Sequence, residues 1–195
     1  DEMNLKKGHK YLTVFVDLIE RCVLFATEGK DSGAFERFVE EMEAHNMHPK
    51  VVTQLAIDMS AAYQKGAREN LPNAKVVFDK FHVIKLVGDA VDKVRRREAS
   101  THEGGKALKG LRWLFRKNPE NLHEEEEHLL SEMDLKNFPT GIAYQMRLNF
   151  QDIYKSRTKE GASEKITKWC SWVESKVRLF GKVLDPMATV AKTIS

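Results

Sequence analysis

Two aspartates follow apolar runs at points where a strand is expected to end. Asp58 comes after the run 51–57, and Asp79 comes after the run 76–78. Strands that alternate with helices indicate a parallel sheet, and ligands of open α/β sheets gather outside the carboxyl ends of the strands. Carboxylates at such an edge can hold the paired divalent cations that stabilise phosphoryl transfer. Asp58 is therefore the first functional candidate, although a lone aspartate here is also a common helix cap.

The first hundred residues carry the pattern that must position these acids. Alternating apolar residues predict strands, and apolar residues at helical spacing predict amphipathic helices between them. The pattern predicts an α/β domain over residues 1–99, with a mixed sheet that has an antiparallel side and a parallel side. The predicted elements are a hairpin of strands at 11–18 and 21–27, a helix at 32–45, a strand ending before Asp58, a helix at 61–70, a strand at 76–78 and a helix from 80 to about 99.

The pattern changes after Gly104 and Gly105, which predict a linker. Everything beyond has helical periodicity, so residues 100–195 are predicted to form an all-helical region. Asp185 and Pro186 have the residue types of a helix N-cap and first position. The predicted helices cover 108–115, 122–133, 142–153 and 163–180, with one more starting at Asp185.

Composition excludes several classes of protein. With 195 residues, 42% hydrophobic and 31% charged, the chain can bury a core as one domain, or as one domain with an insertion. No run approaches the roughly 20 apolar residues of a transmembrane helix, and there is no signal-peptide pattern. The distant Cys22 and Cys170 predict reduced core thiols and a cytosolic protein. Because the chain lacks an initiator Met, we expect it to be a fragment.

The net charge of +3 is small, but the basic residues are concentrated in one block. Only Glu98 and Glu103 interrupt this block, and residues 120–134 are then acidic. The block has two interpretations: solvated helix faces, or a surface that neutralises nucleic-acid phosphates. Its members are Lys93, Arg95, Arg96, Arg97, Lys106, Lys109, Arg112, Arg116 and Lys117.

Aromatic and histidine side chains add weaker signals. Trp113, Trp169 and Trp172 have the residue type that stacks on unpaired bases, but Trp169 lies on an apolar stripe, which favours core packing. The remaining histidines lack the Cys/His spacing of a structural zinc site. These are His45, His48, His102, His123 and His128.

Three segments together resemble one family. They are KGHKYLTVFVDL, DMSAAYQKGARENLPNAKVVFDKFHVIKLVGDAVDKVRRRE and KGLRWLFRKNPENL. The sequence resembles the DDE domain of ISL3-family bacterial insertion-sequence transposases over almost its whole length. The resemblance implies a ribonuclease-H-like fold whose first strand is largely missing here, followed by a helical insertion. It also implies metal-dependent DNA cleavage and strand transfer.

The resemblance maps the family's acids onto this chain in part. The first acid maps onto Asp1, which precedes the KGH segment, and the second onto Asp58; the third has no counterpart before Ser195. Asp17 is an alternative first acid because it also ends a strand, but such an aspartate is more often a turn former. Asp79 and His82 are supporting candidates. Equally, Asp79 is interpreted as a helix cap, and His82 as a packed or surface residue.

Cofactor, partners and activity follow from the resemblance. Asp1 and Asp58 would hold Mg²⁺ or Mn²⁺, and the partners would be transposon-end and target DNA, with a homo-oligomer in the full-length bacterial, cytoplasmic protein. The fragment is expected to be inactive because the third acid is absent, and prone to aggregation because its strand edges are open. The alternative is a non-catalytic DNA-binding remnant or domesticated module. Another ribonuclease-H-like nuclease would lack the helical region after Gly105.

Overall fold

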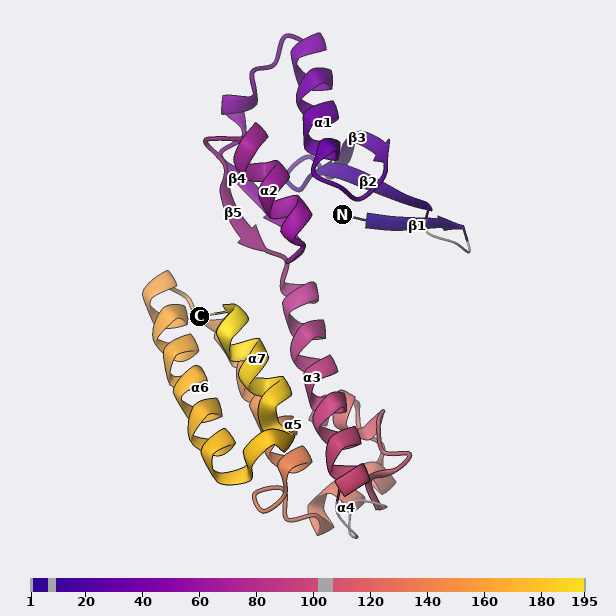
Figure 1. Ribbon diagram of the computed structural model, residues 1–195, viewed down its shortest axis with the longest axis vertical. Coiled ribbons are helices and arrows are strands. Elements are labelled where there is room, and N and C mark those ends of the chain that lie inside the picture. The colour runs from indigo at the N-terminus through magenta and orange to yellow at the C-terminus, as the bar shows by residue number, and fades with distance from the viewer. Residues whose placement is uncertain (1, 7–9, 102–106, 195) are drawn as a thin grey trace. The chain divides into compact units, whose positions relative to one another are not determined.

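A computed structural model of the chain describes residues 2–6, 10–101 and 107–194, with only the backbone for 2–6, 10 and 101. The chain divides into two compact units, Asp1–Val83 and Ile84–Ser195. This division falls inside one continuous helix, α3 (Lys80–Thr101), and not at residues 99 and 100 where the composition changes. The first unit contains every described strand, and the second is helical, so the chain is mixed α/β (Figure 1).

The strands of the first unit form two hydrogen-bonded sheets. One is antiparallel in the order β1-β2-β3, and the other is the parallel pair β4-β5. The sequence predicted a single mixed sheet, and this detail is not seen in the described residues. β1 reaches only Thr13 of β2, so the residues from Val14 to Asp17 pair with β3 alone. The strands are β1 (Glu2–Lys6), β2 (Lys10–Asp17), β3 (Cys22–Glu28), β4 (Gln54–Ile57) and β5 (Lys75–Phe78).

One core joins both sheets to helices α1 (Gly33–Ala44) and α2 (Ala61–Asn70). Phe15 of β2 stacks on Phe38 of α1, with ring centroids 4.1 Å apart. Ile57 of β4 is buried in the same cluster. Tyr63 of α2 shares a 2.7 Å hydrogen bond with the buried hydroxyl of Thr13. The two sheets are thus held by shared side chains instead of by a common backbone ladder.

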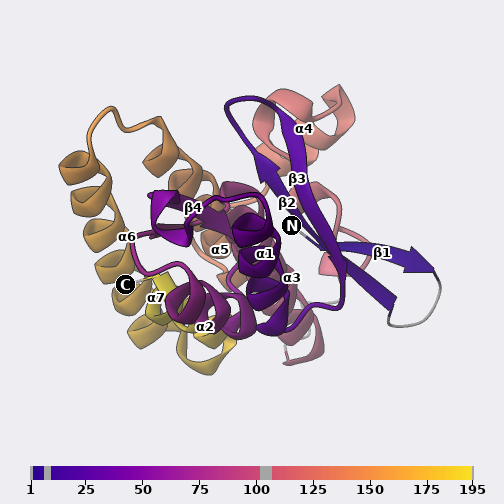
Figure 2. The same ribbon diagram turned by 90° about the horizontal axis from the view of Figure 1, so that it is seen from above.

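The second unit packs α3 with the helices that follow it. The sequence predicts an apolar stripe along α3 from Phe81 to Val94, of which Val87, Val91 and Val94 are buried in this unit, whereas Phe81 is 68% exposed. Glu98 of α3 accepts hydrogen bonds from the backbone N–H and the hydroxyl of Thr140, at 2.8 and 2.6 Å. Figures 1 and 2 show α6 and α7 side by side in this unit. The helices are α4 (Glu124–Glu132), α5 (Pro139–Gln151), α6 (Lys159–Phe180) and α7 (Asp185–Ile194).

The sequence-based helix at 108–115 is wrong. The structure has turns there, followed by the short 3₁₀ helix η3 (Leu114–Arg116). Gly110 adopts φ +84°, a left-handed conformation that interrupts a helix. The stripe that suggested a helix is nevertheless buried at Leu114 and Phe115. The other 3₁₀ helices are η1 (Pro49–Val51), η4 (Pro119–Asn121), η5 (Asp152–Lys155) and η6 (Gly181–Leu184).

Two glycines inside helices provide a test of how closely α1 and α2 pack. A Cβ at Gly66 of α2 would lie 2.5 Å from the ring of Phe35 and 2.9 Å from the carbonyl oxygen of Ser32. A Cβ at Gly88 of α3 would meet nothing within 4 Å. We expect Gly66→Ala to lower the free energy of unfolding by about 1–3 kcal/mol because of overpacking. Gly88→Ala, which only gains helix propensity, should raise it by up to about 1 kcal/mol.

Urea denaturation followed by circular dichroism measures both variants. Equal effects of the two substitutions would show that the α1–α2 contact is looser than the structure describes.

Candidate functional site

The two predicted acids lie at the same edge of the parallel pair. β4 and β5 are in register from Gln54 opposite Lys75 to Ile57 opposite Phe78. The ladder continues one bond further, because the N–H of Asp79 donates to the carbonyl oxygen of Ile57 at 2.7 Å. Asp58 and Asp79 therefore leave neighbouring strands at their carboxyl ends, as the sequence predicted. We call this pair, with His82, the acidic rim.

Asp58 is half-buried and its carboxylate is held by the backbone of the turn that follows. The N–H of Ser60 donates to its Oδ1 at 2.6 Å. Ser60 is the N-cap of α2, but its side chain makes no capping hydrogen bond. In the described residues no hydrogen bond reaches the other carboxylate oxygen, Oδ2. The bond from Ser60 thus orients the Asp58 carboxylate at the rim through Oδ1 and leaves Oδ2 available to a ligand.

Asp79 is the N-cap of α3, the structural alternative that the sequence left open. The N–H of Phe81 donates to its Oδ1 at 2.7 Å, and the N–H of Val83 donates to its carbonyl oxygen at 3.1 Å. Nδ1 of His82 lies 3.2 Å from Oδ2, within hydrogen-bond distance. Both oxygens of Asp79 are therefore engaged, and this acid is less available to a ligand than Asp58.

Of the two candidates for the first acid, Asp1 and Asp17, only Asp17 is described by the structure. Asp1 lies outside the described residues. Asp17 accepts hydrogen bonds from the N–H groups of Ile19 and Glu20, at 2.7 and 3.0 Å, so the interpretation as a turn former is confirmed. Across 2–6, 10–101 and 107–194, no three His, Cys, Asp or Glu side chains gather in a way that could hold a metal ion.

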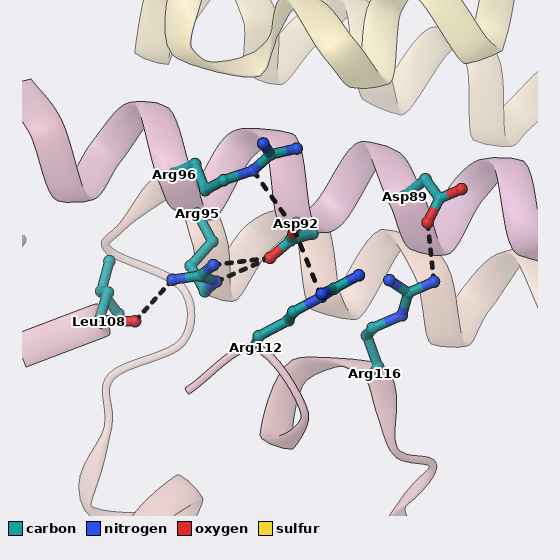
Figure 3. Close-up of polar contacts among 7 residues, drawn as sticks. All are labelled: Asp89, Asp92, Arg95, Arg96, Leu108, Arg112 and Arg116. Carbon is teal, nitrogen blue, oxygen red and sulfur yellow. Dashed lines mark hydrogen bonds and ion pairs between the residues drawn. The ribbon is translucent and has the colours of Figure 1, made fainter. Parts of the chain in front are cut away.

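Part of the basic block is engaged inside the protein (Figure 3). Arg95 is only 8% exposed, and its guanidinium donates to Oδ1 of Asp92 at 2.8 and 3.0 Å and to the carbonyl oxygen of Leu108 at 3.0 Å. The other oxygen of Asp92 is 3.3 Å from Arg96 and 3.7 Å from Arg112. A single buried carboxylate therefore holds three arginines, and Arg95 has no surface to offer to a phosphate.

Two further cations of the block have carboxylate partners. Arg116 lies 2.7 Å from Asp89, and Lys117 lies 2.7 Å from Glu126. The hydrogen bond from Lys117 and that with the His123 backbone lower the pKa of Glu126. Lys106 lies outside the described residues. The exposed members of the block are Lys93, Arg96, Arg97, Lys109 and Arg112.

The three tryptophans divide between core and surface. Trp169 is 4% exposed and its indole N–H donates to the carbonyl oxygen of Met146 at 2.9 Å, so the prediction of core packing is confirmed. Trp172 is half-buried, whereas Trp113 is 64% exposed. Both cysteines are free; Cys22 is exposed, which contradicts the prediction of a core thiol, because its strand segment lies at the edge of the core.

Sequence reasoning missed the residues that fix the basic block. Asp92 has the helical spacing of an ion pair with Arg95 and Arg96, and this signal was present in the sequence, where the block was interpreted only as solvated helix faces or as a phosphate-neutralising surface. Arg147 gave no local signal. It is buried in α5, where it bonds to the carbonyl oxygen of Lys117 and, at 3.0 Å, to Oδ1 of Asn118. Burial lowers the pKa of Arg147.

Comparison with known proteins completes the description. A family model described as a transposase matches residues 1–195. The chain belongs to the ISL3 family of transposases. No solved structure matches this ISL3-family chain. In the described residues, no helix is both long enough and apolar enough to span a membrane.

Two curated relatives of this ISL3-family chain are transposases. The transposase for insertion sequence element IS1001 of Bordetella parapertussis is 30% identical over 179 residues, which cover 89% of this chain and 43% of the relative. The transposase for IS1557 of Mycobacterium tuberculosis is 25% identical over 199 residues, which cover 89% and 44%. The chain therefore spans less than half the length of the curated relatives it matches.

Two aspartates on one face of α3 test the buried network. Asp92→Ala removes the partner of the buried Arg95 guanidinium, and we expect a loss of about 3–5 kcal/mol in the free energy of unfolding because a buried charge is left unpaired. Asp89→Ala removes only the partly exposed pair with Arg116, and should cost about 1 kcal/mol or less. Denaturant titration of both variants measures the difference; similar losses would contradict the burial of Arg95.

Proposed function

We propose that this chain forms part of the catalytic domain of a DDE transposase, which cleaves transposon ends and joins them to target DNA with the help of divalent cations. The observation that carries the proposal is the position of Asp58, the residue onto which the resemblance maps the family's second acid. It lies at the carboxyl end of β4, half-buried, with one oxygen oriented by the Ser60 N–H. A catalytic carboxylate at such a strand end would face the ligand side of the sheet.

The strand arrangement supports a ribonuclease-H-like core. The antiparallel β1-β2-β3 sheet and the parallel β4-β5 pair share one apolar core. The residues of β2 beyond Thr13 pair only with β3. A further strand beside them, parallel to β4, would join the two sheets into one mixed sheet. The resemblance implies such a strand, since it predicts a ribonuclease-H-like fold whose first strand is largely missing here.

The donor set for a metal ion is met only in part by the described residues. Asp58 offers one carboxylate oxygen, while both oxygens of Asp79 are engaged in capping α3 and contacting His82. Asp1, proposed as the second ligand, lies outside the described residues. A bound Mg²⁺ or Mn²⁺ pair would supply electrophilic stabilisation of the phosphodiester oxygens. The contribution of this chain is to orient Asp58, with Asp79 and His82 as supporting residues beside it.

The basic block is proposed to contact DNA phosphates through its exposed members. Lys93, Arg96, Arg97 and Lys109 are exposed, and phosphate contacts of this kind add affinity without reading the sequence. Arg95 is removed from the proposal because its guanidinium is buried against Asp92. The remaining cations would hold the DNA backbone, and their contribution should weaken as salt rises.

A second candidate function is a DNA-binding module without catalysis. It needs no carboxylate cluster and would use only the exposed members of the basic block. The two candidates predict different outcomes for Asp58, since only the catalytic one requires its charge.

Asp58→Asn in a full-length parent protein tests the catalytic proposal. We expect cleavage of transposon-end DNA with Mg²⁺ to be abolished, because an amide is a poor ligand for a hard cation, while DNA retention in a mobility-shift assay is unchanged. Asp17→Asn is the matched control: Asp17 also ends a strand, but its Oδ1 accepts two turn N–H groups and the residue is interpreted as a turn former, so cleavage should persist. Residual nicking by Asp58→Asn would overturn the assignment.

Mn²⁺ titration of the 195-residue chain tests the metal site without activity. We expect binding on the order of millimolar or weaker, because few carboxylates leave most of the coordination shell to water. Water-proton relaxation measures this binding, and Asp58→Asn should remove it while Asp134→Asn, on an exposed turn, should not. Binding that is indifferent to Asp58 would favour the non-catalytic module.

A further inference from the structure

Trp113 is an exposed aromatic residue on a segment that is otherwise anchored. Its exposed fraction is 64%, whereas the next two residues, Leu114 and Phe115, are 4% and 1% exposed. Tryptophan is highly buried on average, since its ring gains much from leaving water. In the described segment 107–123, Trp113 is the one large apolar side chain that is exposed. The exposure is therefore a local exception within this segment.

Two guanidinium groups lie against the Trp113 ring. The guanidinium carbons of Arg112 and Arg116 are 5.0 and 5.9 Å from its centroid, within cation–π distance. Each arginine is tethered by an aspartate of α3: Arg112 to Asp92 at 3.7 Å, and Arg116 to Asp89 at 2.7 Å (Figure 3). The cations beside the ring are thus held in place before any partner binds.

The backbone on the carboxyl side of Trp113 is equally fixed. The N–H groups of Arg116 and Lys117 both donate to the Trp113 carbonyl oxygen, at 3.2 Å. Beyond them, Arg147 and Gln151 of α5 each donate to Oδ1 of Asn118, at 3.0 Å. A rigid support lowers the entropy cost of binding, because little is left to order.

The charge around Trp113 selects the kind of partner. The segment 107–117 around Trp113 carries four cationic side chains, Lys109, Arg112, Arg116 and Lys117, and no carboxylate. Carboxylates from other elements are paired with three of these cations: Asp92 with Arg112, Asp89 with Arg116, and Glu126 with Lys117. An apolar protein surface would have to desolvate these cations, whereas a polyanion would be attracted by them.

We propose that Trp113 is a stacking platform for an unpaired base of single-stranded or distorted DNA, with Arg112 and Arg116 beside the base and the exposed lysines on its phosphates. Base stacking on an exposed aromatic ring tolerates any sequence, because every base has a π face. A paired duplex keeps its bases stacked inside and offers the ring nothing comparable. The inference rests on the proposed function for its DNA partner, and adds the strand form that this surface recognises.

Fluorescence anisotropy with the 195-residue chain tests the proposal. The probes are a labelled mixed-sequence single strand and the blunt duplex of the same length, at one salt concentration. We expect Trp113→Ala to weaken single-strand binding by about five- to a hundredfold, the range found for one stacked base, and to leave duplex binding unchanged. Trp113→Phe should retain most of the single-strand affinity because it keeps an aromatic face.

Leu179→Ala is the matched control, since Leu179 of α6 is 69% exposed, similar to Trp113. It should change neither affinity. Thermal unfolding of each variant checks that the fold is intact, and the phenylalanine variant stays informative if the alanine variant is unstable. Quenching of tryptophan emission by the single strand should be seen in the wild type and lost in Trp113→Phe.

Three outcomes would overturn the proposal while leaving DNA binding in place. In the first, Trp113→Ala binds the single strand as tightly as the wild type does. In the second, Trp113→Ala loses as much affinity for the duplex as for the single strand. In the third, poly-glutamate competes with DNA for the chain, and Trp113→Ala weakens poly-glutamate binding as much as it weakens single-strand binding. The last would identify an acidic protein as the partner of this surface. Failure of the wild-type chain to bind either DNA would instead remove the DNA partner of the proposed function, and this inference with it.

Discussion

The parallel pairing of β4 with β5 is the constraint on which the acidic rim depends. Parallel strands in register bring the residues that follow them to one edge, and the bond from the Asp79 N–H to the Ile57 carbonyl oxygen extends the ladder to that edge. Each acid then serves the next element: Asp58 orders the turn into α2, and Asp79 caps α3. The same few bonds therefore set strand register, helix starts and carboxylate positions.

The second unit depends on a different interaction, the buried Asp92 carboxylate. Burying an arginine is costly unless its charge is paired, so Arg95 and Asp92 stabilise the fold only as a pair. Arg96 and Arg112 approach the other oxygen, and Arg112 carries the connection to the Trp113 segment. Part of the positive charge that was interpreted as a DNA-binding surface is thus buried. The Asp92 carboxylate also positions two of the arginines that remain exposed, Arg96 and Arg112.

Asp58 and Asp79 each follow a strand of the parallel pair, but their carboxylates are held differently. One oxygen of Asp58 accepts the Ser60 N–H, and no hydrogen bond reaches the other oxygen in the described residues. Asp79 shows the opposite situation, because its oxygens are used by α3 and His82. The strand-end position is therefore common to both aspartates, and what differs between them is the hydrogen-bonding capacity that remains at the carboxylate.

The sequence by itself determined the local elements, because hydrophobic period and turn residues act over a few neighbours. The hairpin, α1, α2, α3 and the buried stripe of α6 all follow from it, and so does the resemblance that ranks Asp58. It failed at 108–115, where Gly110 adopts a left-handed conformation that the apolar stripe does not reveal.

Only the tertiary structure decided which charged and aromatic side chains are free. Arg95 is buried and Trp113 is exposed, although both lie in the same basic block. The Arg95 guanidinium is enclosed in part by the carbonyl oxygen of Leu108, which lies 13 residues further along the chain. The segment that follows Trp113 is held by Arg147 of α5, which donates to the Lys117 carbonyl oxygen. Burial is a property of the packed chain, since it depends on what covers a residue and not on its neighbours in sequence.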